Sequence, residues 1–392
     1  MINVKDEAMA LNQQLVEWRR HFHAHPEIGM ETPNTEAFIV EELKKMGISK
    51  IRQGLAKHGV TALIEGKKPG KVLGLRCDID ALNMKEETGL PFRSTNDYMH
   101  ACGHDAHTAM LLGAAKILTR RLDDLKGTVK LIFQPAEETT QGAAVMIEDG
   151  VLSNPPLDGI IGLHTGGLWK DAETGEIGYR YGPLMAACDF FTITFHGKGG
   201  HGATPHLTVD PIAMACQAYT ALQLLVSRET NPLDSAVVTI GAIQGGTAEN
   251  IIAPSCTLRG TLRALSPATR EMLQTRIKKI CEDIASALRG SAEINYMYGP
   301  PPVVNDKEMT DKLRRAAADI VGEEHVHEIH EPTMGAEDMA FYMEQVPGTF
   351  FLHPSFKSDV ESYPHHHPKF DIDESVFWIG SATFAQFALT WQ

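Results

Sequence analysis

Three short apolar runs, each typical of a buried β-strand, lead into side chains that can bind a metal ion or move a proton. The runs and the polar residues that follow them are 72–75 with Asp78 and Asp80, 128–133 with Glu137 and Glu138, and 160–163 with His164. Helical patterns separate the runs, and strands that alternate with helices indicate an α/β domain with a largely parallel sheet. Because the carboxyl ends of parallel strands meet at one edge of a sheet, we expect these polar side chains to lie close together.

The stretch from His100 to His107 adds a dense group of chemically active side chains, among them Cys102, His104 and Asp105. Thiolate, imidazole and carboxylate groups are the ligands that suit zinc and its first-row neighbours. One loop cannot hold a metal ion alone, so further ligands must come from distant strand ends. The sequence therefore predicts a metal site where this loop meets the edge of the sheet.

The Glu137–Glu138 pair follows its strand through a proline, so the backbone can point one carboxylate at a metal ion and the other at a water molecule. Metal-assisted hydrolysis needs that division, because a carboxylate whose lone pairs bind metal is a poor general base. The alternative for the pair is a solvated helix N-terminus, and the alternative for His164 is a core histidine. Proximity to Cys102 and His104 at one sheet edge favours the metal site.

A second interpretation makes Cys102 a nucleophile that pairs with a neighbouring histidine. A nucleophile needs one base and one orienting group, whereas this chain carries acidic and imidazole groups at several strand ends. A metal-dependent hydrolase accounts for that surplus better than a cysteine-nucleophile amidase does.

The pattern changes after residue 182. Strand, helix, strand, strand, helix and strand then follow at residues 190–196, 210–227, 236–243, 257–263, 267–288 and 292–297. This order is that of a ferredoxin-like α+β sandwich. We therefore predict an α/β fold in which a discontinuous larger domain, residues 1–182 and 299–392 with a largely parallel mixed sheet, carries an inserted smaller domain, residues 183–298.

Length and charge limit the remaining possibilities. At 392 residues the chain exceeds the size at which a single core keeps growing, and its net charge of −14 argues against nucleic acid or an anionic membrane as partner. No window approaches the roughly 18 consecutive apolar residues of a membrane span, and residues 1–20 lack a signal-peptide pattern. We expect a cytoplasmic protein whose six cysteines are free thiols.

An ordered series of motifs runs through the chain, at residues 19–27, 78–82, 100–107, 133–138, 162–164, 197–206, 246–250, 335–338 and 366–368. With these motifs the chain resembles the M20 metallopeptidase family over essentially its whole length. Within that family it resembles the amidohydrolases of subfamily D, which include hippurate hydrolases, auxin-conjugate hydrolases and N-acyl-amino-acid deacylases. The resemblance implies a zinc-peptidase-like catalytic domain with an inserted lid or dimerisation domain.

The resemblance also implies roles for particular residues. Two divalent metal ions per chain, of zinc, manganese, cobalt or nickel, would be bound by Cys102, His104, Glu138, His164 and His366. Glu137 would be the general base. From the inserted domain, His201 and Asn250 would close over the substrate and stabilise the developing oxyanion. Arg263 would bind the carboxylate of the substrate.

The predicted function is therefore metal-dependent hydrolysis of the amide bond in N-acyl amino acids, with a water molecule activated by two metal ions. The resemblance further implies a homodimer or higher homo-oligomer formed through the inserted domain, in which His201 serves its own site or its partner's. The alternative from another class is a non-catalytic protein that binds a small molecule in a metal-dependent way on the same fold.

Overall fold

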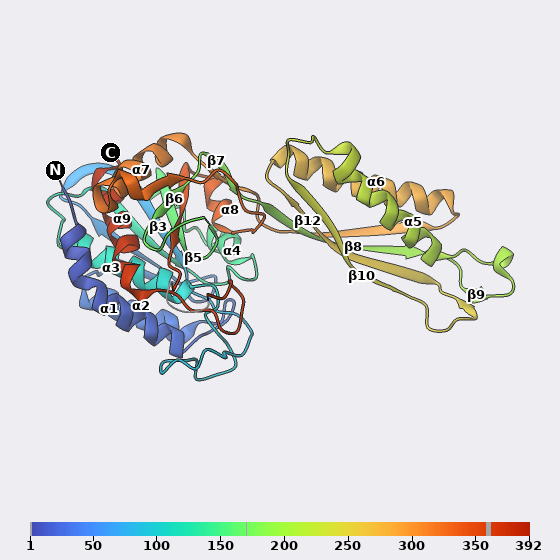
Figure 1. Ribbon diagram of the computed structural model, residues 1–392, viewed down its shortest axis with the longest axis horizontal. Helices are drawn as coiled ribbons and strands as arrows, with labels where there is room; N and C mark the ends of the chain where they lie inside the picture. Colours follow the sequence, from blue (N-terminus) through green and yellow to red (C-terminus); the bar gives the residue numbers. More distant parts are fainter. Residues whose placement is uncertain (1, 170, 358–361) are drawn as a thin grey trace. The chain divides into compact units, whose positions relative to one another are not determined.

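The computed structural model describes residues 2–169, 171–357 and 362–392 (Figure 1). The chain divides into two compact units, one of Met1–Leu184, Val304–Pro332 and Asp338–Gln392, the other of Met185–Val303 and Thr333–Glu337. Each unit has its own cluster of buried apolar side chains. The predicted fold class, α/β with an inserted ferredoxin-like α+β region, is confirmed. None of the helices among the described residues combines the length and apolar character that crossing a membrane requires.

An eight-stranded mixed sheet forms the centre of the first unit, in the order β1-β2-β4-β3-β5-β16-β6-β15. Its strands are β1 (Ile51–Leu55), β2 (Gly59–Glu65), β3 (Lys68–Asp78), β4 (Lys126–Gln134), β5 (Gly159–Gly166), β6 (Ile177–Tyr179), β15 (Val326–Glu328) and β16 (Gly348–Pro354). The central strands β4, β3, β5 and β16 run parallel to one another. All residues of β5 are buried, as a parallel strand covered on both faces requires.

Helices cover both faces of this sheet (Figure 1). One face carries α1 (Lys5–Ala24), α2 (Pro33–Lys45), α3 (His104–Thr119), α7 (Lys307–Val321) and α9 (Phe377–Thr390), and the other carries α4 (Gly142–Glu148) and α8 (Met339–Met343). All residues of α3 except Lys116 and Thr119 are buried, because the helix is apolar on almost every side. Gly103, whose φ of 91° lies in the left-handed region, precedes α3 and so sets His104 at its first turn.

The second unit is built on a four-stranded antiparallel sheet in the order β10-β12-β8-β13. Its elements are β8 (Ala187–His196), β9 (Gly200–His201), α5 (Pro211–Leu224), β10 (Ala236–Gly245), β11 (Ile251–Ile252), β12 (Ser255–Ala264), α6 (Pro267–Ala287) and β13 (Ser291–Tyr298). The Asp210 carboxylate caps α5 by accepting from two backbone N–H groups of its first turn. The helix predicted at 210–227 ends at Leu224 and continues as a π-helical turn, Leu225–Glu229. Outside both sheets, β7 (Gly182–Met185) pairs with β14 (Val303–Asn305).

Candidate metal centre and active site

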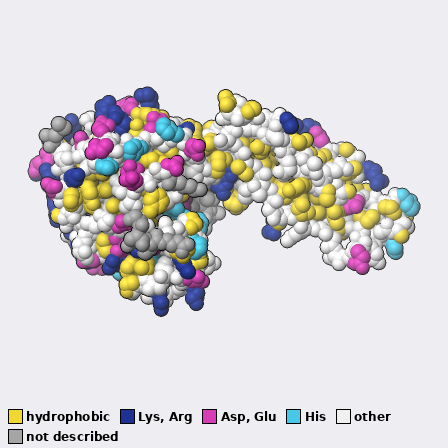
Figure 2. All heavy atoms as spheres, viewed as in Figure 1, with side chains coloured by type: hydrophobic (Ala, Val, Ile, Leu, Met, Phe, Trp, Pro, Cys, Tyr) yellow, Lys and Arg dark blue, Asp and Glu magenta, His cyan; other side chains and the backbone are white. Residues whose placement is uncertain are grey.

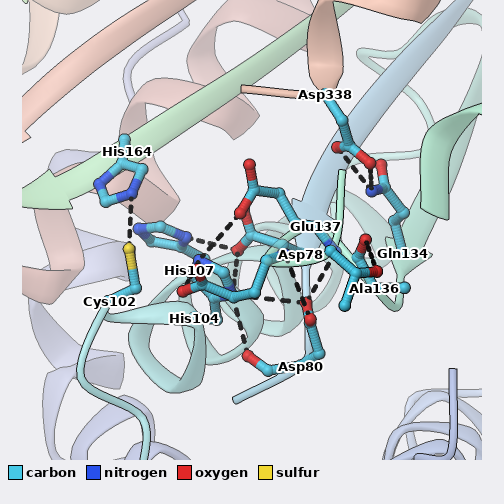
Figure 3. A network of polar contacts seen from close by, with 12 residues as sticks. Asp78, Asp80, Cys102, His104, His107, Gln134, Ala136, Glu137, His164 and Asp338 are labelled. Carbon is cyan, nitrogen blue, oxygen red and sulfur yellow. Dashed lines mark hydrogen bonds and ion pairs between the residues drawn. The ribbon is translucent and has the colours of Figure 1, made fainter. Parts of the chain in front are cut away.

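The polar residues predicted at strand ends gather at one edge of the large sheet (Figure 3). β3 ends at Asp78, β4 is followed by Glu137 and Glu138, and His164 lies in the last part of β5. β3 pairs in parallel with both β4 and β5, so the carboxyl ends of all three strands point to the same edge. The loop before α3 reaches this edge as well, and its Cys102 side chain faces His164 (Figure 3).

Ligand-type atoms from these strand ends and from two loops form overlapping groups, and within each group the atoms lie within 4.8 Å of one another. Three of the groups are Cys102–His104–His164, His104–Glu137–Glu138 and Cys102–Glu138–His366. The structure therefore brings together all five side chains named from the sequence as metal ligands, with Glu137 beside them. They meet although the chain between the first and the last of them passes through most of the fold.

The spacing of these atoms suits ligands that share an ion. His104 Nε2 lies 3.8 Å from Glu138 Oε1, and His366 Nε2 lies 3.4 Å from Glu138 Oε2. Cys102 Sγ lies 3.4 Å from His164 Nε2. Zn–N and Zn–O bonds of about 2.0–2.2 Å and Zn–S bonds of about 2.3 Å put two ligands of one zinc ion roughly 3–4 Å apart. The distances are therefore those that a zinc-sized ion needs.

Two of these atoms, His104 Nε2 and Glu138 Oε1, are buried and have no hydrogen-bond partner within the described part of the chain. A buried polar atom without a partner costs about 1–3 kcal/mol, so such atoms are rare unless something satisfies them. A cation between the two would satisfy both. Together with the thiol and the other imidazoles, the residues present fit a divalent first-row metal ion.

Backbone carbonyl groups fix how the two buried histidines present their rings. His104 Nδ1 lies 2.9 Å from the carbonyl oxygen of Asp80, and His164 Nδ1 lies 2.8 Å from that of Thr165. A carbonyl oxygen can only accept a hydrogen bond, so Nδ1 donates in both rings. In the neutral form of each ring, Nε2 then has a free lone pair that can bind a metal ion.

The turn after β4 sends the two glutamate side chains in different directions. Its Ala136 has φ = 61°, in the left-handed region that residues with a Cβ seldom adopt. The buried Asp80 carboxylate holds the next two residues by accepting from the backbone N–H of Glu137 at 3.0 Å and of Glu138 at 3.3 Å. Asp80 therefore positions both glutamates from the neighbouring strand end.

A buried network around Asp78 connects the strand ends (Figure 3). The Asp78 carboxylate accepts from His107 Nδ1 at 2.6 Å and from Arg76 Nη1 at 3.0 Å. His107 Nε2 accepts from the backbone N–H of Thr165 at 2.8 Å, and Arg76 Nη2 donates to Asp338 at 2.7 Å. Reasoning from the sequence gave no role to Arg76 or Asp338. The signals were a charged residue directly after an apolar run, for Arg76, and a place in the motif at 335–338, for Asp338.

Burial and acidic neighbours shift the pKa values of the ligand-type side chains. Burial raises the pKa of Glu138 to about 7; the nearby His104 opposes this shift, and the Asp80 carboxylate adds to it. Burial also raises the pKa of the Cys102 thiol well above its usual value and lowers that of His164. All three shifts disfavour the charged form of the side chain. A bound cation would therefore stabilise the site, because it favours the charged forms of two ligands, the Glu138 carboxylate and the Cys102 thiolate.

The candidate residues of the inserted region lie in the second unit. His201 ends β9 and pairs with Ile251 of β11, and Gly202 N–H donates to the carbonyl oxygen of Asn250 at 2.8 Å. His201 and Asn250 are therefore neighbours on an exposed loop tip. Arg263 lies on β12, paired with Cys188 of β8.

A buried cluster of thiol, imidazole and carboxylate groups at the carboxyl edge of an α/β sheet is the kind of site found in metal-dependent hydrolases. Comparison with known proteins identifies the family. Residues 74–390 match the family described as Peptidase family M20/M25/M40. The N-acetyl-L-cysteine deacetylase of Bacillus subtilis (strain 168) is 42% identical over 386 residues, which cover 96% of this chain and 89% of that protein.

Two further relatives agree. The IAA-amino acid hydrolase ILR1-like 4 of Arabidopsis thaliana is 39% identical over 376 residues, covering 94% of this chain and 84% of the relative. The crystal structure of the Bacillus subtilis YXEP protein, described as a dinuclear metal binding peptidase from the M20 family, superposes with a TM-score of 0.84. It is 36% identical and covers 97% of this chain and 98% of that chain.

This chain belongs to peptidase family M20/M25/M40, as its motifs predicted. It is a metal-dependent hydrolase that cleaves amide bonds, and its relatives agree with the predicted amidohydrolase subfamily.

Proposed function

We propose that this protein hydrolyses the amide bond between an acyl group and an amino acid, using two divalent metal ions. The observation that carries the proposal is the cluster of five ligand-type side chains with the Glu137 carboxylate beside it. The names of the deacetylase and of the IAA-amino acid hydrolase support the substrate class, because both describe amides of amino acids. The description of the YXEP protein as a dinuclear metal binding peptidase supports two ions.

The ions would be held by Cys102, His104, Glu138, His164 and His366. Zinc, manganese, cobalt and nickel all suit a mixed set of thiolate, imidazole and carboxylate ligands. Bound divalent ions supply Lewis acidity, which polarises a carbonyl group and lowers the pKa of a water molecule.

Glu137 would be the general base. Its Oε2 lies 3.9 Å from His104 Nε2, at the edge of the cluster, while Glu138 is turned toward His366. Glu137 would accept a proton from the attacking water and deliver it to the nitrogen of the leaving amino acid. The Asp80 carboxylate would keep the base in place through its bond to the Glu137 N–H.

His201 and Asn250 would donate hydrogen bonds to the oxyanion of the tetrahedral intermediate, and Arg263 would bind the substrate carboxylate. Their support is chemical: an imidazole and an amide lie side by side on one loop tip, and a guanidinium can bind a carboxylate with two hydrogen bonds. A well-placed oxyanion donor contributes about 3 kcal/mol to catalysis, so loss of either should be measurable.

The homo-oligomer would form through the second unit. α5 exposes Ile212, Tyr219 and Leu224, and the edge strand β10 exposes Val237 and Ile243. Figure 2 shows hydrophobic side chains gathered over the region of α5 and β10. An apolar helix face beside an unpaired strand edge is self-complementary about a two-fold axis and is hazardous when exposed, so a dimer that covers both is expected. His201 would then act in its own site or in the partner's.

The cytoplasmic location stays a prediction.

The test is a hydrolysis screen of N-acetyl, N-benzoyl and longer N-acyl amino acids. Chelated protein should be inactive, and zinc, manganese, cobalt or nickel should restore turnover of at least one substrate class. Metal-loaded protein that binds these compounds without hydrolysing any would instead support the non-catalytic alternative. Loss of activity in Cys102→Ser with unchanged metal content would support the cysteine-nucleophile amidase.

A further inference from the structure

His366 is held in a backbone conformation that is uncommon for residues other than glycine. Its φ of 64° lies in the left-handed region, and its side chain is 54% exposed. Such a conformation persists only when surrounding contacts impose it. His366 Nε2 nevertheless lies 3.4 Å from Glu138 Oε2, so something must hold this exposed residue against the buried cluster.

Local backbone bonds supply part of the restraint. The His366 N–H donates to the carbonyl oxygen of Ala101 at 2.9 Å, and the Glu87 N–H donates to that of Pro368 at 2.8 Å. Both bonds lie at or before Pro368. The segment that follows is restrained by one backbone bond, from the Asp373 N–H to the carbonyl oxygen of Ser355 at 2.9 Å, and by side chains, because Asp371 and Glu374 both pair with Arg19 of α1.

The Arg19 side chain is fully buried and contacts three carboxylates. Its Nε donates to Asp105 at 2.8 Å, its Nη1 to Glu374 at 3.0 Å and its Nη2 to Asp371 at 3.4 Å. Asp105 directly follows His104 in α3. One guanidinium therefore joins the helix that carries His104 to the segment that follows His366.

The charges around this guanidinium are balanced. Asp105 also contacts His23 Nδ1 at 2.7 Å, Glu374 also pairs with Arg20 at 2.6 Å, and Asp371 also pairs with Lys357. A buried charge is tolerated only when it is paired and hydrogen-bonded, so moving the carboxylates away from Arg19 would be unfavourable in free energy. The planar guanidinium has donors in fixed directions and can therefore set the relative positions of several carboxylates, which a lysine cannot do.

We propose that Arg19 is a positioning residue for the metal centre: by binding Asp105 together with Asp371 and Glu374, it holds His366 against Glu138. The proposal rests on the proposed function, because it takes His366 to be a metal ligand. Arg19 does not touch the metal ions or the substrate. It acts through the segment between His366 and Glu374.

The test measures zinc binding in variants that weaken the contacts of Arg19 by changing its partners Asp371 and Glu374. Asp371→Asn combined with Glu374→Gln removes both carboxylate charges and keeps the shapes, while Arg19 keeps Asp105 as partner. This pair of substitutions is safer for folding than Arg19→Met, which would leave three carboxylates without their common cation. Arg20→Met is the matched control. Among the described residues Arg20 contacts Glu374 but neither Asp105 nor Asp371, and its side chain is 47% exposed.

Zinc content and affinity would be measured by equilibrium dialysis against zinc with a competing chelator, beside thermal unfolding of the metal-free protein. His366→Ala is the reference. We expect Asp371→Asn/Glu374→Gln to weaken the more weakly held zinc about 10–100-fold, as loss of an outer partner of a metal ligand does. In the His366→Ala background, Asp371→Asn/Glu374→Gln should cause no further loss, because the Arg19 contacts act only through His366. Arg20→Met should bind zinc like the wild type.

Wild-type zinc affinity in a folded Asp371→Asn/Glu374→Gln protein, with clear loss in His366→Ala, would overturn the positioning role alone. A lower unfolding temperature without a change in zinc affinity would do the same, since it would show a merely structural contact. Wild-type zinc affinity in His366→Ala would instead refute His366 as a ligand, and with it both this inference and the proposed ligand set.

Discussion

Replacing Asp80 with asparagine tests how the two glutamates are positioned. Asp80 Oδ1 and Oδ2 accept from the backbone N–H groups of Glu137 and Glu138 at 3.0 and 3.3 Å, and the side chain is buried. Asparagine keeps one accepting oxygen and turns an NH₂ group toward the second N–H. The variant therefore loses one hydrogen bond to a charged acceptor, worth about 1.5–3 kcal/mol.

If that loss appears entirely in metal binding, Asp80→Asn should bind zinc about 10–100-fold more weakly than the wild type, since 1.4 kcal/mol is a factor of ten. Turnover at saturating zinc should fall as well, because the Glu137 N–H shares the anchor. Zinc titration with a competing chelator and hydrolysis of an N-acyl amino acid measure the two effects.

Asp158→Asn is the matched control. The Asp158 carboxylate also accepts from a backbone N–H, that of Val72 at 2.8 Å, near the other end of β3. It should leave zinc affinity and turnover unchanged. Wild-type zinc affinity and turnover in Asp80→Asn would show that this carboxylate does not fix the turn.

Three further predictions concern the base, a glycine and a buried histidine. Glu137→Gln should keep its zinc content, measured by elemental analysis, while kcat falls about 10²–10⁴-fold; an active variant would remove Glu137 from the role of base. Gly166→Ala should lower the thermal midpoint more than Gly89→Ala: both positions have positive φ, but a Cβ at Gly166 would lie 2.5 Å from the His365 ring and one at Gly89 would meet open space. The overlap should cost about 1–3 kcal/mol beyond the backbone strain, and equal midpoints would contradict this. Burial disfavours the charged form of His23, but hydrogen bonds to Asp105 and Glu86 outweigh burial and raise the pKa of His23. Protonated His23 therefore stabilises the folded protein fully below about pH 6.5, and this stabilisation is lost as pH rises through the higher pKa of the folded state. Thermal unfolding across pH 5–9 should therefore show the wild type losing its advantage over His23→Gln as pH rises; a constant difference would refute the assignment.

Much of the fold and of the site follows from local patterns in the sequence. β5 is an apolar run that ends near a histidine, and in an α/β chain such a run is typical of a central parallel strand. Once β3, β4 and β5 are parallel neighbours, their carboxyl ends must meet, which is why Glu138 and His164 could be expected to lie together.

Other features could not be read from the sequence, because they depend on contacts between distant residues. The burial of Arg19 depends on Asp371 and Glu374, which lie near the other end of the chain and pair with it. The left-handed backbone at Ala136 and His366 could not be predicted either, since this conformation is uncommon for any residue with a Cβ. Strands as short as β6 and β15 carry too few residues for a periodic pattern.

An anomalous diffraction map of zinc-loaded crystals, recorded above and below the zinc absorption edge, would locate the metal ions directly. We expect two zinc peaks within bonding distance of Cys102 Sγ, Glu138, and the Nε2 atoms of His104, His164 and His366. Glu137 should lie beside the peaks without binding either ion. Zinc peaks elsewhere in the molecule, with none among these side chains, would show that these residues are not the metal ligands.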